Sequence, residues 1–310
     1  EFRRVLFRSG IQSFGIAFSI FVSAPLGKIL SGVVTEAVNF DDAMNRVKKV
    51  TGGTNAEIDA LGESLTQASL MLTSTREELA KYAEDWGALG VTISSTADAA
   101  MMSGLAEWTS KLVMSAEDLT AADVVEKLGK AIILYFPDIH AFDEVKEGIG
   151  SVILALEDAN NIGASDILST FQRMAPIAEQ MGISMVDALT MSASAASGIA
   201  SAERAGTELA AALQKVSINT KKAAEATGIQ ESAIIDLINT DAEGYILSMA
   251  YSIAQMSDNV AQQNALYEQL GVTGGKAIAA LVSSWENVEK NIKIANSAFA
   301  EGVYMQMQYA

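Results

Sequence analysis

The stretch from Asn160 to Val216 constrains the fold most, because helical periodicity and helical end signals agree along its whole length. An apolar stripe recurs there at intervals of three and four residues, as one face of a helix does. The stripe comprises Ile167, Leu168, Phe171, Met174, Ala175, Ala178 and Met181. Gly182 then predicts a helix end, and Ser184 predicts the cap of a second helix. Another stripe after Glu203 predicts a third helix.

A glycine followed by Val or Ile and then a polar residue occurs at four places. The four copies are Leu89–Thr92, Met181–Ser184, Thr227–Gln230 and Leu270–Thr273. Glycine accepts the left-handed conformation that ends many helices, and the apolar residue after it folds back onto the last turn. We therefore predict Gly90, Gly182 and Gly271 just past helix ends with positive φ. A true repeat of a hairpin unit and the ordinary use of glycine in helical hairpins both fit this spacing, and we favour the second.

Comparable signals run through the rest of the chain. The predicted caps are Thr54 or Asn55, Thr75 with Glu78 as a capping box, and Ser115 with Asp118. Pro176 lies inside an apolar stripe, where it should kink the helix or mark a fresh start. No run alternates polar and apolar residues as a strand would. We predict an all-α fold, a multi-helical array of helix hairpins joined by glycine-capped turns, with no sheet.

Composition excludes several function classes. The chain has no cysteine, which excludes disulfides and thiolate metal sites. Its formal net charge of −17 argues against nucleic-acid binding, which needs clustered Lys and Arg to displace counterions. We therefore expect no sequence-specific nucleic-acid binding. Aromatic residues make up only 6%, so small and aliphatic side chains must do the packing, which favours closely approaching helices.

The N-terminal residues divide into two segments. Residues 1–9 lack a helical stripe, and Leu6–Ser9 can be encoded by the end of a common sequencing adapter, so we expect them to be an assembly artefact. Residues 10–39 form an apolar segment without charge from Gly10 to Gly27, which is borderline in length for a membrane span. We favour a packed helix followed by a turn at Pro25. We expect the core domain at 40–300 and a truncated downstream region starting at 301–310.

No set of residues predicts catalysis. His140 is the only histidine, and with Asp143 and Glu144 it lacks the convergent ligands that a metal site needs. The segment from Gly271 to Lys276 looks like a phosphate loop but has Leu270 and Ala277 where the motif needs Gly and Ser or Thr. We predict a protein that is not an enzyme, with no catalytic, cofactor-binding or metal-binding residues and no cofactor.

The segment Ser192–Gly198 is built from Ser, Ala and Gly alone, which suits close contact between helices. Packing within the chain and self-association both fit it, and we favour packing within the chain.

Four short motifs carry a resemblance to a known family. They are Met174–Ala178, Met181–Ser184, Ser197–Ile199 and Ala205–Leu209. In sequence and in order these motifs resemble the core region of phage tail tape measure proteins. The resemblance extends from about Val22 to Glu301. At Ala210 the chain departs from the family, which often has a basic residue there. If that basic residue docks a partner, the departure puts such docking in doubt.

The resemblance implies a structural protein that acts as a scaffold, sets tail length during assembly and leaves the tail lumen at DNA ejection. It implies the tail tube protein, tail assembly chaperones and tail-tip proteins as partners. It also implies the virion tail lumen and the host bacterial cytoplasm as locations. Self-association and contact with the host membrane stay open. The alternative is a membrane-active helical protein that inserts through residues 10–34.

Overall fold

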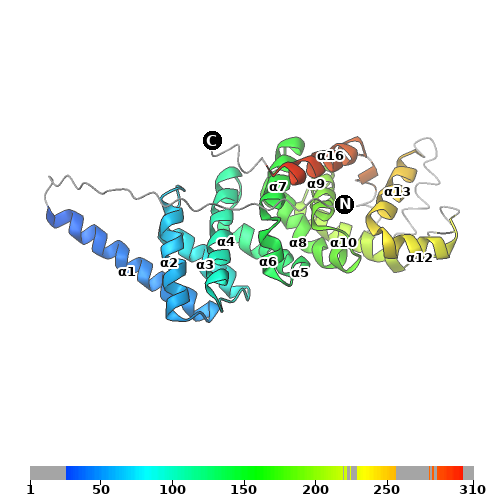
Figure 1. Cartoon of the computed structure of the whole chain (residues 1–310). Helices are drawn as coiled ribbons and strands as arrows, with labels where there is room; N and C mark the ends of the chain where they lie inside the picture. Colours follow the sequence, from blue (N-terminus) through cyan, green and yellow to red (C-terminus); the bar gives the residue numbers. More distant parts are fainter. Residues whose placement is uncertain are drawn as a thin grey trace. The chain divides into compact units, whose positions relative to one another are not determined.

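Every regular element in the described residues is a helix. The computed structural model describes residues 26–218, 220–221, 224, 229–255, 279, 281–282 and 285–302. The helices are α1 (Leu26–Thr51), α2 (Asn55–Ser69), α3 (Arg76–Ala88), α4 (Thr96–Ser115), the π-helix η1 (Asp123–Gly129), α5 (Lys130–Tyr135), α6 (Ile139–Asp143), α7 (Lys146–Asn160), α8 (Ala164–Gln180), α9 (Met185–Gly198), α10 (Ala202–Ile218), α12 (Glu231–Thr240), α13 (Ala242–Gln255) and α16 (Trp285–Glu301) (Figure 1). The predicted all-α fold is confirmed.

The chain divides into two units, Glu1–Asn39 and Phe40–Ala310. Of the first unit the structure describes the helical backbone of α1 from Leu26 onward. Most of the predicted apolar segment, including the turn at Pro25, lies outside the described residues. Among the helices that the structure describes, none combines the length and apolar character needed to cross a membrane.

Capping boxes open two of the early helices. Before α2, the Thr54 hydroxyl accepts the Glu57 N–H while the Glu57 carboxylate accepts the Thr54 N–H. Thr75 and Glu78 make the same reciprocal pair before α3, as predicted. Each box satisfies backbone donors that a helix start leaves unpaired.

Two of the predicted glycine stops are confirmed. Gly90 follows α3 with φ of +104° and Gly182 follows α8 with φ of +74°. After Gly182, the Ile183 N–H reaches back to the Ala178 carbonyl at 2.9 Å, and Ile183 is buried. These are the bonds of a Schellman motif, in which the residue after glycine folds onto the last turn. Gly228 and Gly271 lie outside the described residues.

The predicted cap at Ser115 and Asp118 is wrong. Ser115 is the last residue of α4, and its hydroxyl donates to the Lys111 carbonyl of the same helix. The cap falls instead at Thr120, which exchanges backbone and side-chain hydrogen bonds with Asp123 at the start of η1. Asp118 serves another helix, because its carboxylate accepts the Ser165 N–H in the first turn of α8. Thr120 and Asp123 have the same spacing as Ser115 and Asp118, and the path of the chain decides which pair forms the cap.

Helix α8 lies at the centre of the second unit. It packs against η1, α5, α7, α9 and α10. Its predicted apolar stripe is buried from Ile167 to Ala178, with Phe171 and Met174 fully enclosed. The helix runs through Pro176 without restarting, so the break that the sequence allowed does not occur. Proline is tolerated there on a face that is exposed to solvent.

Replacing Gly182 with alanine should lower the free energy of unfolding by about 1 kcal/mol, because an L residue is strained at this positive φ. Urea denaturation would measure the loss. The matched control is Gly62→Ala inside α2, where an added Cβ would meet only ordinary contacts at 3.6 Å or more. That change should stabilise the helix by up to about 1 kcal/mol. A stabilising Gly182→Ala would contradict the helix stop.

Candidate functional site around helix α8

The four motifs between Met174 and Leu209 lie on α8, α9, α10 and the turn that joins α8 to α9. The tightest contact among them is the crossing of α8 and α10. Gly206 of α10 lies against the backbone of Thr170, where an added Cβ would come within 2.4 Å of the Thr170 carbonyl oxygen. The Thr170 hydroxyl donates to the Ala202 carbonyl at 2.9 Å. The glycine of the Ala-Gly-Thr motif therefore has a steric role, since only glycine lets the two helix backbones come this close.

Helix α9 also packs against α8, and its stretch of small residues is buried between neighbouring helices. Ser192, Ala193, Ser194 and Ala195 are all buried, and the Ser192 hydroxyl contacts the Met174 sulfur at 3.2 Å. The buried hydroxyls also donate to carbonyls one turn earlier in α9. Packing within the chain, which we favoured for this segment, is thus confirmed for these four residues. Ser197 and Gly198 are exposed at the helix end.

Alanine at Gly206 should lower the free energy of unfolding by about 1–3 kcal/mol, because the new Cβ meets rigid backbone and the two helices must separate. Thermal or urea denaturation would measure this. Gly62→Ala is again the control, since it makes the same change inside a helix without the close approach. An unchanged or higher stability for Gly206→Ala would show that the crossing is looser than described.

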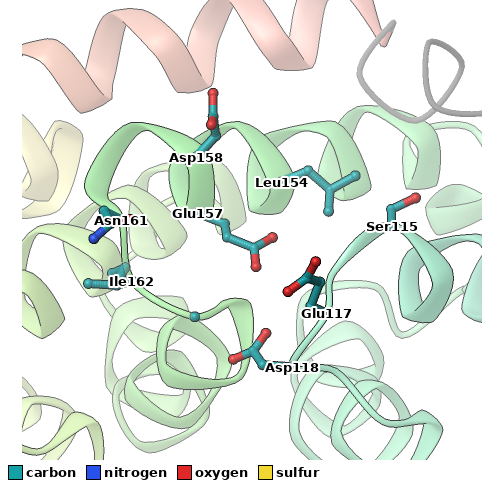
Figure 2. Close-up of a pocket in the computed structure, with 9 residues that line it drawn as sticks. Ser115, Glu117, Asp118, Leu154, Glu157, Asp158, Asn161 and Ile162 are labelled. Carbon is teal, nitrogen blue, oxygen red and sulfur yellow. The ribbon is translucent and has the colours of Figure 1, made fainter.

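An open, acid-lined pocket of about 600 Å³ lies at the start of α8. Figure 2 shows the carboxylates of Glu117, Asp118 and Glu157 directed toward one another, while Asp158 points away. Asp118 lies on the segment after α4, and Glu157 lies near the end of α7. The fold thus brings carboxylates from two separate segments together beside the first turn of α8.

The start of α8 partly compensates this clustering of negative charge. Its first N–H groups carry partial positive charge and lack helical partners. Asp118 accepts the Ser165 N–H at 3.1 Å, and a backbone hydrogen bond from Ala164 acts on Glu157. Burial and then the negative charge of Asp118 nevertheless raise the pKa of Glu157 above its usual value. An added Cβ at Gly163 would lie 2.0 Å from Asp118 Oδ2, so a larger residue there would displace this carboxylate.

Glu157→Gln should raise the stability of the protein at neutral pH by less than about 1 kcal/mol, since the carboxylate is partly solvated. The raised pKa means that the folded state binds a proton more readily than the unfolded state, so charged Glu157 is a penalty that disappears as pH falls. The gain should vanish below about pH 4, where the side chain is neutral in both states. Urea midpoints measured across pH would test this.

Asp98→Asn provides a comparison of opposite sign. Hydrogen bonds from the backbone and hydroxyl of Ser94, and then from His140, lower the pKa of Asp98. Charged Asp98 therefore stabilises the folded state above the ordinary carboxyl pKa, and this contribution is lost as pH falls. Asn should be destabilising at neutral pH and progressively less so in acid. If the stability changes of the two variants vary with pH in the same direction, the opposite pKa shifts of Glu157 and Asp98 are contradicted.

His140 lies at the start of α6 and contacts α4. Its Nε2 is 2.9 Å from Asp98 Oδ1, and its N–H is capped by Asp138. Asp143, which the sequence placed near it, pairs with Lys146 instead. Within the residues that the structure describes, no three His, Cys, Asp or Glu side chains converge as metal ligands would. The phosphate-loop-like segment from Gly271 to Lys276 lies outside those residues.

Two interhelical polar contacts escaped the sequence reasoning. Lys127 of η1 donates to Ser165 and Ser169 of α8. Asn291 of α16 pairs with Asn160 at the end of α7, 131 residues away. Neither has a local signal, because Lys, Ser and Asn are ordinary surface residues and only the fold brings them together.

Comparison with known proteins adds no family to these observations. No protein-family model matches the chain, and neither a curated protein nor a solved structure matches it.

Proposed function

We propose that this chain is the core segment of a phage tail tape measure protein, a structural protein that sets tail length and leaves the tail lumen ahead of the DNA. The observation that carries the proposal is the resemblance of four ordered motifs between Met174 and Leu209. Two of them have specific roles in the fold. Gly182 and Ile183 end α8, and Gly206 permits its crossing with α10.

The physical properties of the chain suit this role. A ruler requires a fixed length per residue, and helix supplies a rise of about 1.5 Å per residue. The net charge of −17 suits a protein that must line up in a tube and slide out again, because like charges keep it from adhering to acidic neighbours, DNA among them. The partners are the tail tube protein, tail assembly chaperones and tail-tip proteins, in the host cytoplasm during assembly and in the virion afterwards.

Tail length in the phage that encodes this chain tests the proposal. Helix-forming inserts of about 50 and about 100 residues, placed in frame after Gly302, should lengthen the tail by up to about 75 and about 150 Å if they form extended helix. Gly302 follows the last described helix, so the inserts leave its contacts intact. Electron microscopy of purified particles would measure the tails.

The two insert lengths control for each other, because a ruler predicts a proportional increase, whereas general damage to assembly does not. A second control places the shorter insert in another tail gene. Tails of unchanged length that contain the longer protein would reject the proposed function.

A further inference from the structure

Helix α16, the last described helix in the sequence, packs on α7 and α9, with a smaller contact to α13 (Figure 1). Its buried side chains are few and mostly small. They are Val288, Asn291, Ala295 and Ala298. They recur at intervals of three, four and three residues, which places them on one face of the helix. The contact is therefore a narrow seam with a polar residue inside it.

Asn291 is the centre of that seam and is fully buried. Its Nδ2 donates to Asn160 Oδ1 at 3.0 Å and to Ser194 Oγ at 2.9 Å. Its Oδ1 accepts from Asn160 Nδ2 at 3.0 Å. One side chain thus joins the end of α7, the middle of α9 and α16. A buried amide of this kind fixes the register of a helix pair, since a shift would leave it unpaired.

The seam is further defined on each side of Asn291. Lys290 Nζ donates to the Ala159 carbonyl in the last turn of α7, where a positive charge is favourable. Toward the other end, α16 approaches Gly148 so closely that an added Cβ would lie 2.8 Å from Phe299 Cδ2. The Phe299 side chain is 36% exposed, so the two helices lie close together here although the ring is not fully buried.

The seam differs in kind from the packing of α8. Helix α8 buries Ile, Leu, Phe and Met side chains completely, and these dominate the free energy of burial. The face of α16 buries one valine and two alanines, and its two isoleucines, Ile292 and Ile294, are only partly buried, so it removes less apolar surface from water. On release, water replaces the hydrogen bonds of Asn291, Asn160 and Ser194, so their net contribution to holding the helix is small. Release of α16 is consequently less costly than release of α8.

We propose that α16 is a detachable clasp, which opens and recloses as one unit while α8, α9 and α10 stay folded, and that the Asn291 amide sets the register at which it recloses. Local opening of weakly packed elements below the global unfolding free energy is a general property of folded proteins. This inference goes beyond the tape measure role and does not depend on it.

Hydrogen exchange of the full chain, followed by mass spectrometry, tests the clasp. The amides of α16 should exchange faster than those of α8 in the unaltered protein. Asn291→Ala should speed exchange in α16 by about tenfold. The variant leaves Asn160 and Ser194 without this partner while α16 is packed, whereas water pairs with them once α16 is released, so the packed state alone is destabilised. Exchange in α8 should not change. The matched control is Asn296→Ala, the same substitution on the exposed face of the same helix.

A covalent lock provides the second measurement. Phe299→Cys removes the ring that an added Cβ at Gly148 would meet, and the chain has no other cysteine, so Gly148→Cys with Phe299→Cys places a single cysteine pair across the seam. Oxidation should slow exchange in α16 to the level of α8, and reduction should reverse it. The proposal is overturned if α16 in the unaltered chain exchanges as slowly as α8, if Asn291→Ala speeds both helices alike, or if the formed disulfide leaves α16 exchange unchanged.

Discussion

The packing of η1, α5, α7, α9 and α10 depends on the burial of one face of α8. Five elements pack around that helix, and its enclosed side chains run from Ile167 to Ala178. The close crossing with α10 follows from the same arrangement, because Gly206 lets the α10 backbone reach Thr170. Ser192 of α9 is one of the small residues at this face, since its hydroxyl contacts the Met174 sulfur.

The start of the same helix also lies beside the acid-lined pocket. Its first turn receives Asp118 and lies beside Glu157, so that the helix dipole offsets part of the repulsion between the two carboxylates. Burial, and then the charge of Asp118, still raise the pKa of Glu157 above its usual value. In an acidic chain, like charges must meet somewhere, and the start of a buried helix is a favourable place for them.

Helix ends were the features most accessible to sequence reasoning. Thr75 with Glu78 and Gly182 with Ile183 each act within a few residues, so spacing alone identified them. The cap at Ser115 and Asp118 had the right spacing and was wrong, because Asp118 satisfies a backbone donor of α8 47 residues further on. The acid-lined pocket was missed for the same reason, since its carboxylates come from separate segments.

By itself, the sequence determined the helical class, two of the glycine stops and the buried face of α8, because propensity, capping and periodicity are properties of a few neighbouring residues. Only the tertiary structure decided which helices meet. Two contacts illustrate this: Asn160 pairs with Asn291, and Gly206 approaches Thr170. Both join residues that are far apart in the sequence, so no local sequence pattern indicates them. Close contact between helices could be anticipated from small residues, but the partner in each contact could not.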